Sequence, residues 1–262
     1  MNETALEVLE QYDFEVKRTW KGRGVYFLDT SGGVYMLKEH RGSEEKLEKL
    51  CQLLTSLETV QFFKTDLPVR AKEGQFISLY CHDGSRILPR PISICEIDKE
   101  NGTLRIVYRV AGKGTDEFST YGEGEKIEIL GPLGNGFTLQ PEKSAMLMAG
   151  GIGIPPMLGL AKALNADKHI FLGYRDRYNF LADDFMPYGN VYIATEDGSV
   201  GCKGNVLTAL GTTTIKPDII MACGPMPMLR AIKKYAEENN ITAYISLEER
   251  MACGVGACLG CV

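Results

Sequence analysis

The sequence predicts a small antiparallel β barrel, then an α/β domain with a five-stranded parallel sheet, and finally a short cysteine-rich segment. Strand-like runs separated by Gly, Asp and Glu turns occupy residues 58–140, which is typical of small barrels. From Ser144 onward, apolar runs of five or six residues alternate with helical stretches, as in βαβ units. Cys253, Cys258 and Cys261 then lie close together and predict a metal-binding segment over residues 248–262.

The bulk composition limits the functional classes. With 262 residues, 44% of them hydrophobic, the chain is long enough to bury a sizeable core. A net charge of -5 and the lack of a Lys/Arg-rich run argue against a nucleic-acid surface. The sequence shows neither a long apolar run nor a signal-peptide pattern, so we expect no membrane segment. Its eight cysteines therefore indicate thiols or metal ligands in a cytoplasmic protein.

Residues 1–57 form a segment with a pattern of their own. Three short β-like runs, 14–18, 25–29 and 34–40, are separated by glycine turns, and Ser43 is a candidate N-cap for a helix extending to Leu57. This order, with Lys38 on the third run, resembles the start of the small lobe of the spore-coat and aminoglycoside-phosphotransferase group of kinase-like proteins. No catalytic aspartates follow in a large second lobe, so we expect no phosphotransfer and interpret Lys38 as a surface lysine.

Two motifs in the predicted barrel carry groups suited to a phosphate-bearing ligand. Arg90-Pro91-Ile92-Ser93 is expected at the end of a barrel strand, where an arginine can form two parallel hydrogen bonds with a pyrophosphate. Alone, this motif also fits a β-bulge with a surface arginine. Val107-Tyr108-Arg109 adds an aromatic ring and a second cation, and Gly114 and Thr115 add a backbone N–H and a hydroxyl at a turn. The two motifs in this order are more specific than either one.

The α/β domain, residues 141–247, is expected to bind a nucleotide at the carboxyl ends of its strands. The expected strands are 145–149, 169–174, 191–195, 218–223 and 243–247, with the clearest helices at 155–164, 205–210 and 226–239. Gly150, Gly151 and Gly153 follow the first strand, and Cys223-Gly224-Pro225-Met226 repeats this arrangement after a later one. Such loops bind nucleotides in open α/β sheets, although a strict G-x-G-x-x-G pattern is absent. Cys223 is interpreted as a nicotinamide neighbour, with a buried strand-end thiol as the alternative.

The cysteines near the end of the sequence follow C-x4-C-x2-C spacing, interleaved with small residues. This matches the start of the plant-type [2Fe–2S] run, and thiolates are the soft ligands that such clusters need. Buried cysteines in a glycine-rich turn and a zinc site are the alternatives. The fourth cysteine of the run would lie beyond Val262, so the expected site is one ligand short. No Ser/His/Asp or Cys/His arrangement is visible, so no catalytic side chain is expected.

Taken together, these motifs identify a family resemblance over residues 65–262. Two further stretches support this resemblance in addition to the motifs described above: Gly131-Pro132-Leu133-Gly134-Asn135-Gly136-Phe137 and the tail from Glu248. The chain resembles the electron transfer subunits of dihydroorotate dehydrogenase B, within the ferredoxin–NAD(P)⁺ reductase superfamily. The resemblance implies an FAD-binding barrel, an NAD-binding domain and a [2Fe–2S] segment. It also implies a heterotetramer with a catalytic FMN subunit that oxidises dihydroorotate in pyrimidine biosynthesis.

The resemblance also assigns cofactor roles to individual positions. It implies that nine barrel residues hold FAD: Arg90, Pro91, Ile92, Ser93, Val107, Tyr108, Arg109, Gly114 and Thr115. It implies that Cys253, Cys258 and Cys261 hold the cluster. The first barrel strand of the family should precede Gly74, where this sequence has the kinase-like segment. We therefore keep two alternatives: a related reductase subunit serving a hydrogenase, sulfide reductase or glutamate synthase, and a non-catalytic chimeric fragment that binds only nucleotide or a partner.

Overall fold

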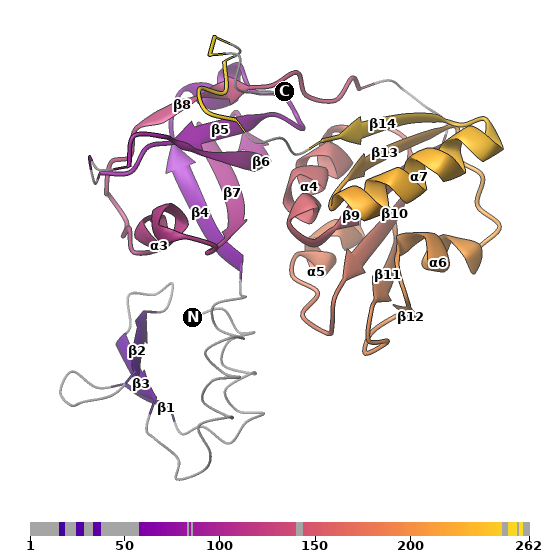
Figure 1. The fold of residues 1–262 in the computed structure, drawn as a ribbon, viewed down its shortest axis with the longest axis horizontal. Coiled ribbons are helices and arrows are strands. Elements are labelled where there is room, and N and C mark those ends of the chain that lie inside the picture. Colours follow the sequence, from indigo (N-terminus) through magenta and orange to yellow (C-terminus); the bar gives the residue numbers. More distant parts are fainter. Residues whose placement is uncertain are drawn as a thin grey trace. The chain divides into compact units, whose positions relative to one another are not determined.

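The computed structural model divides the chain into two compact units, Met1–Leu57 and Glu58–Val262. It describes residues 16–18, 25–28, 34–37, 58–82, 84, 86–139, 144–247, 251–255, 257 and 258 (Figure 1). In the first unit, β1 (Val16–Arg18), β2 (Val25–Leu28) and β3 (Val34–Leu37) form an antiparallel sheet in the order β1-β3-β2, within the predicted runs. Lys38 and the predicted helix from Ser43 lie outside the described residues.

The barrel of the second unit is a five-stranded antiparallel sheet in the order β4-β7-β6-β5-β8. Alternate residues of its strands, with Phe118 of the short helix, bury a core that includes Ile77, Leu104, Ile106 and Tyr108. Its elements are β4 (Glu58–Lys64), the 3₁₀ turn η1 (Leu67–Val69), β5 (Phe76–Leu79), β6 (Arg90–Asp98), β7 (Thr103–Arg109), α3 (Lys113–Ser119) and β8 (Ile129–Leu133). The sequence predicted no barrel strand before Gly74, but β4 lies there and pairs with β7 over its whole length.

Arg90-Pro91-Ile92-Ser93 was expected at the end of a strand, and this placement is wrong. The motif begins β6, after the loop that returns the chain from β5. At this end β6 pairs with β5 alone, through Leu79↔Arg90 and Ser78↔Pro91, because the pairing with β7 starts only at Ile94. Pro91 is tolerated here because this stretch of β6 has a sheet neighbour on one side only.

The α/β domain contains the expected parallel sheet, in the order β12-β11-β10-β9-β13-β14. The five predicted strands are present, and β12 is a sixth that was not predicted, because two residues are too short to produce an apolar run. The strands are β9 (Ser144–Gly150), β10 (Asp167–Tyr174), β11 (Asn190–Thr195), β12 (Cys202–Lys203), β13 (Ile219–Cys223) and β14 (Thr242–Ser246).

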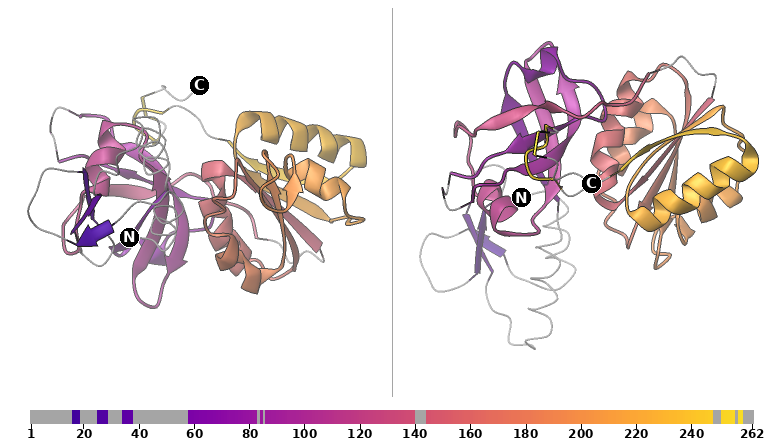
Figure 2. Two further views of the ribbon diagram at one scale, coloured as in Figure 1. Left: turned by 90° about the horizontal axis from the view of Figure 1, so that it is seen from below. Right: turned by 45° about the horizontal axis from the view of Figure 1, so that its top comes forward.

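Helices cover both faces of this sheet (Figure 2). Successive residues of β9 are buried on opposite faces: Leu147 packs with α4 and α5, whereas Met146 and Met148 pack with α6 and α7. The helices are η2 (Gly151–Gly153), α4 (Ile154–Ala163), α5 (Ala182–Phe185), η3 (Met186–Tyr188), α6 (Val206–Gly211) and α7 (Met226–Asn239). Among the described residues, none of these helices is long and apolar enough to cross a membrane.

Candidate functional site

The sheet order places a topological switch point between β9 and β13. From β9 the chain runs outward through β10 and β11 on one side, then returns to add β13 on the other side of β9. The loops that leave two such strands diverge and open a crevice at their carboxyl ends, where ligands of open α/β sheets bind. The loop at Gly150–Gly153 leaves β9, and the loop at Cys223–Pro225 leaves β13. The structure therefore brings the two predicted nucleotide loops together.

These two loops meet backbone to backbone. A Cβ added at Gly153 would lie 2.5 Å from the carbonyl carbon and oxygen of Cys223 and 2.6 Å from the Gly224 nitrogen. Gly151 has a φ of +52°, and a Cβ there would meet no atom within 4 Å. One glycine is thus required for the close approach of the loops. The other leaves an open backbone surface that a ligand can contact.

Both loops lead directly into helices. Pro155 lies in the first turn of α4, and α7 starts at Met226 directly after Pro225. Proline suits this position because the first helical N–H groups have no partner inside the helix. Pro155 and Pro156 leave the first turn of α4 without free N–H groups. The N–H groups of Met226 and Met228 in α7 and the helix dipoles are therefore what favour a pyrophosphate at this edge.

In the barrel, the structure brings Arg90 next to Gly114 and Thr115. A Cβ on Gly114 would lie 2.5 Å from Arg90 Nε, so the arginine side chain crosses the first turn of α3. Arg90 Nη1 donates to the carbonyl of Leu88 at 2.5 Å. Thr115 Oγ1 accepts the N–H groups of Ala111 and Gly112 at 2.9 and 3.1 Å. A guanidinium beside an ordered turn fits an anionic group such as a diphosphate.

The other residues of the barrel motifs are placed differently. Tyr108 is 2% exposed, its side chain lies in the barrel core, and its hydroxyl has no hydrogen-bond partner among the described residues. Burial raises the pKa of Tyr108 above its ordinary value. Val107 is equally buried but packs into the α/β core. Of Val107-Tyr108-Arg109, only Arg109, at the end of β7, is exposed. Of the Arg90 motif, Pro91 is exposed, whereas Ile92 and Ser93 are half-buried.

The cysteine segment forms a loop that surrounds one thiol with hydrogen-bond donors. The backbone N–H of Val255, the thiol of Cys258 and further backbone N–H groups lower the pKa of Cys253 to about 6. A thiolate among N–H groups is the environment that an iron–sulfur ligand requires. Cys258 is exposed, and Cys261 lies outside the described residues. In the part of the chain that is described, no three metal-binding side chains come together. Two of the three predicted ligands are thus found on one loop.

This loop rests against the barrel. A Cβ on Gly254 would lie 3.3 Å from Leu133 Cδ1 and 3.5 Å from Ser78 Oγ. Ser78 on β5 is opposite Pro91 on β6. The cysteine loop therefore contacts the strand that pairs with the Arg90 motif.

The sequence interpretation missed several residues at these sites. Met228 fills the space beside both nucleotide loops: its Sδ lies 2.7 Å from a Cβ added at Gly150, and its Cε lies 2.5 Å from one added at Gly224. Ser78 and Leu133 support the cysteine loop. An apolar or small residue in a strand or helix carries no signal for such a role, because the role depends on which distant loop folds onto it.

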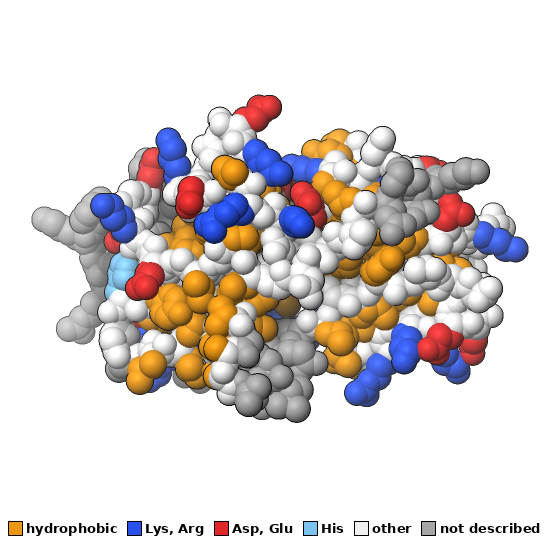
Figure 3. Space-filling view, turned by 90° about the horizontal axis from the view of Figure 1, so that it is seen from above, with side chains coloured by type: hydrophobic (Ala, Val, Ile, Leu, Met, Phe, Trp, Pro, Cys, Tyr) orange, Lys and Arg blue, Asp and Glu red, His pale blue; other side chains and the backbone are white. Residues whose placement is uncertain are grey.

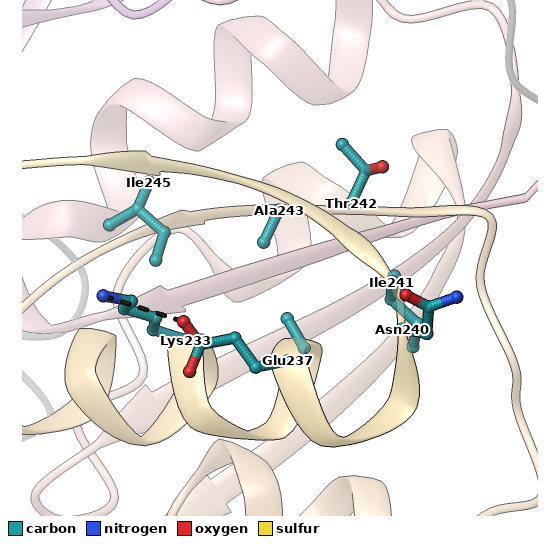
Figure 4. Close-up of a pocket in the computed structure, with 8 residues that line it drawn as sticks. Lys233, Glu237, Asn240, Ile241, Thr242, Ala243 and Ile245 are labelled. Atoms are coloured by element: carbon teal, nitrogen blue, oxygen red, sulfur yellow. Dashed lines mark ion pairs between the residues drawn. The ribbon is translucent and has the colours of Figure 1, made fainter.

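A hollow of ≈ 560 Å³ lies elsewhere, between the second half of α7 and β14 (Figure 4). Lys233 Nζ and Glu237 Oε1 form an ion pair of 3.7 Å at its side. Asn240, which ends α7, and Thr242, which begins β14, lie at the amino end of the strand. The glycine loops are at the carboxyl ends, so this hollow is separate from the candidate nucleotide site.

Comparison with known proteins gives close relatives. No protein-family model matches the chain. It is 44% identical over 197 residues to the electron transfer subunit of dihydroorotate dehydrogenase B (NAD(+)) from Listeria innocua, which covers 72% of this chain and 76% of that protein. The Enterococcus faecalis protein of the same name is 44% identical over 202 residues, covering 73% of this chain and 76% of that protein.

Solved structures agree in fold. A chain from the NADH-dependent reduced ferredoxin–NADP oxidoreductase matches with a TM-score of 0.71 and 29% identity, covering 77% of this chain and 75% of that one. The ferredoxin NADP⁺ reductase of Neisseria gonorrhoeae, solved with FAD and NADP, matches with a TM-score of 0.58 and 16% identity, covering 72% of this chain and 93% of that one. The second match shows that the barrel and sheet have the ferredoxin-reductase arrangement.

Proposed function

The chain belongs to the family of dihydroorotate dehydrogenase B electron transfer subunits and is an oxidoreductase subunit, and on this premise we propose its cofactors and their sites. We propose that it passes electrons between a catalytic flavoprotein partner, a [2Fe–2S] cluster, FAD and NAD⁺. One observation carries the proposal: two glycine loops meet at the switch point of a parallel sheet in the same unit as an arginine-bearing barrel. The two cofactors would supply reversible hydride transfer: reduced flavin would reduce NAD⁺ to NADH and be oxidised, and NADH would reduce oxidised flavin in the reverse direction.

The barrel, residues 58–140, is proposed to hold FAD. Arg90 and the α3 turn at Gly114 and Thr115 supply a cation and backbone N–H groups for the diphosphate, and the Thr115 hydroxyl, which donates to the Gly112 carbonyl, orders that turn. Tyr108 shapes the barrel from within, whereas Val107 on the opposite face of β7 packs into the α/β core. Arg109 is the exposed cation at the end of the adjacent strand.

The α/β domain, residues 141–247, is proposed to hold NAD at the two glycine loops. Gly151 offers open backbone for the ligand, and the N–H groups of Met226 and Met228 in the first turn of α7 are proposed to contact the diphosphate. Cys223 is half-buried at the carboxyl end of β13, where it is placed to contact a nicotinamide ring. Together these groups orient the dinucleotide across the switch point.

Residues 248–262 are proposed to supply Cys253, Cys258 and Cys261 as three of the four cluster ligands and to face the partner subunit. Exposed apolar side chains surround β5 and the cysteine loop: Ile87, Leu88, Leu130 and Val255 are 84%, 54%, 37% and 52% exposed. Figure 3 shows hydrophobic side chains gathered on the barrel part of this face. An apolar face beside a redox centre suits a subunit that docks there, because large exposed apolar patches mark interaction sites. A cytoplasmic location is consistent with ligand thiols.

An anaerobic absorption spectrum tests the proposal. The purified full chain is supplied with FAD, separated from unbound flavin, and titrated with NADH. Flavin bands that bleach on addition of NADH are the expected result, with bound iron and further visible absorbance if the cluster assembles. A protein that retains no flavin, or whose flavin NADH does not reduce, contradicts the proposal. Co-purification of a partner with dihydroorotate-oxidising activity distinguishes this function from that of other reductase subunits.

A further inference from the structure

The barrel and the α/β domain are joined by a tight contact between β6 and α4. A Cβ added at Gly159, in the middle of α4, would lie 2.6 Å from the carbonyl oxygen of Cys95 on β6. Cys95 is 1% exposed and belongs to the same apolar core as Leu158 and Leu160 of α4. The helix therefore lies directly on the backbone of the barrel strand, with no side chain between them.

Four charged side chains form hydrogen bonds and ion pairs at the edge of this contact. Glu96, next to Cys95, accepts hydrogen bonds from Lys162 of α4 and, at 2.5 Å, from Arg105 Nη1 of β7. Arg105 Nη1 also contacts Asp184 Oδ2 of α5 at 2.8 Å. The side chains of Glu96 and Arg105 are 17% and 16% exposed. Glu96 and Arg105 are shielded enough to interact more strongly than a surface pair, whereas their partners across the contact, Lys162 and Asp184, are 39% and 40% exposed. The Glu96 carboxylate links the two domains.

The two elements in contact are those that carry the cofactor motifs. β6 begins with Arg90–Ser93 and reaches the contact at Cys95. α4 begins directly after Gly150–Gly153 and reaches the contact at Gly159. The flavin motif and the nucleotide loop are therefore connected through one strand and one helix turn. Any movement of α4 along or away from β6 shifts the nucleotide loop relative to the barrel.

We propose that Gly159 and Glu96 are positioning residues that fix the nicotinamide of NAD at the distance from the flavin that hydride transfer requires. The inference rests on the proposed function. A hydride moves efficiently only when the reacting atoms are about 3–3.5 Å apart, and a misplacement of about 1 Å costs about 100-fold in rate. A Cβ at position 159 is about 0.8 Å inside the 3.4 Å of an ordinary contact with the Cys95 oxygen. That displacement is of the size that the reaction does not tolerate.

Gly159→Ala and Glu96→Gln test this role in the full chain supplied with FAD. Gly211→Ala is the matched glycine control, since a Cβ there meets nothing within 4 Å. Glu237→Gln is the matched carboxylate control, from an exposed ion pair. Stopped-flow mixing with NADH gives the limiting rate of flavin bleaching, the apparent Kd for NADH and the NADH–flavin charge-transfer absorbance.

Both test variants are expected to lower the limiting rate at least tenfold and weaken the charge-transfer absorbance, with the Kd for NADH and the flavin content within twofold of wild type. A second readout needs no cofactor: the Cys95 thiol, buried under α4, should be alkylated faster in both variants, relative to the exposed Cys258. The controls should match wild type in both experiments.

Wild-type rates and wild-type Cys95 alkylation in both test variants would overturn the positioning role while leaving the proposed function intact. A loss of NADH affinity equal to the loss of rate would also overturn it, because that pattern indicates damage to the nucleotide loop itself. If Gly159→Ala does not fold, the near-isosteric Glu96→Gln decides alone. A wild-type flavin that NADH does not bleach refutes the proposed function, and with it this inference.

Discussion

Gly153→Ala is the substitution that isolates the contact between the two nucleotide loops. Gly153 has a φ of -78°, which alanine adopts without strain, so only the new methyl group matters. That methyl would lie 2.5 Å from the backbone carbon and oxygen of Cys223. No flexible side chain can move aside, and the loops must separate by about 0.9 Å to reach the 3.4 Å of an ordinary contact.

Two consequences of this separation can be measured. Overpacking of this kind lowers the free energy of unfolding by about 1–3 kcal/mol. A loss of about 2 kcal/mol lowers the Tm of a unit of about 200 residues by about 4–8 °C. Hydrogen bonds to a charged diphosphate contribute about 1.5–3 kcal/mol each, so losing one raises the Kd for NADH about 10–100-fold. Thermal unfolding by circular dichroism and calorimetric NADH titration provide the two values.

Gly151→Ala and Gly211→Ala are the controls for this substitution. Gly151→Ala places a methyl in open space but at a φ of +52°, which costs about 1–2 kcal/mol in backbone strain alone. Gly211→Ala also places its methyl group in open space, and its backbone φ is not positive, so it introduces neither a clash nor backbone strain. If Gly153→Ala keeps the wild-type Tm and NADH affinity, the loops do not need their close approach and the argument for this site fails.

Three further predictions concern the barrel. Arg90→Ala should weaken FAD binding about 10–100-fold, from one or two charged hydrogen bonds of about 1.5–3 kcal/mol, as measured by flavin fluorescence titration; Arg90→Lys should recover only part of it. Burial raises the pKa of the Cys95 thiol to about 12, so above pH 9 the unfolded chain loses a proton that the folded chain keeps. Stability should fall by up to about 1.4 kcal/mol per pH unit there, and Cys95→Ala should remove that part of the slope in urea unfolding. Glu117→Ala removes the carboxylate that accepts the Tyr121 hydroxyl and the His82 N–H, both at 2.6 Å. It should cost about 1–3 kcal/mol in thermal unfolding.

Each of these has an outcome that contradicts it. If Arg90→Ala binds FAD as tightly as wild type, Arg90 does not contact the diphosphate of FAD. An identical pH slope in Cys95→Ala would mean that other groups govern alkaline stability, because Tyr108 and Tyr121 also have raised pKa values. For Glu117→Ala, a Tm within 1 °C of wild type, with Glu117→Gln as the conservative comparison, would show that solvent replaces the carboxylate.

The parallel sheet could be predicted because its strands are buried on both faces and read as continuous apolar runs. Ser144–Gly150 is one residue longer than the predicted strand at each end, and Ile219–Cys223 begins one residue later than predicted. The carboxyl-end glycines then locate the crevice, because loops of neighbouring parallel strands must meet at one edge. β12 and α3 were not predicted because neither contains a continuous apolar run or stripe. α3 buries only Gly114 and Phe118, which leaves no apolar stripe to recognise.

The sequence predicted which residues make up the barrel motifs, but not the directions in which their side chains point. Leu104, Ile106 and Tyr108 alternate on one face of β7, so strand periodicity already favoured a core position for Tyr108. Val107 faces the other way and enters the α/β core, which no local pattern indicates. The contact of Gly159 with Cys95 likewise joins positions 64 residues apart through tertiary packing alone. Cys261 lies outside the described residues, so the third cluster ligand stays a prediction.

β9 is hydrogen-bonded to β10 along one edge and to β13 along the other, and its residues from Ala145 to Ala149 are at most 1% exposed. A strand held on both edges and both faces opens only when the surrounding sheet unfolds. Its amides should therefore exchange with deuterated solvent last, at rates set by global unfolding. The loop at Gly150 extends from the slowest-exchanging part of the domain. A ligand that binds there therefore contacts a backbone whose geometry persists through most local fluctuations of the chain.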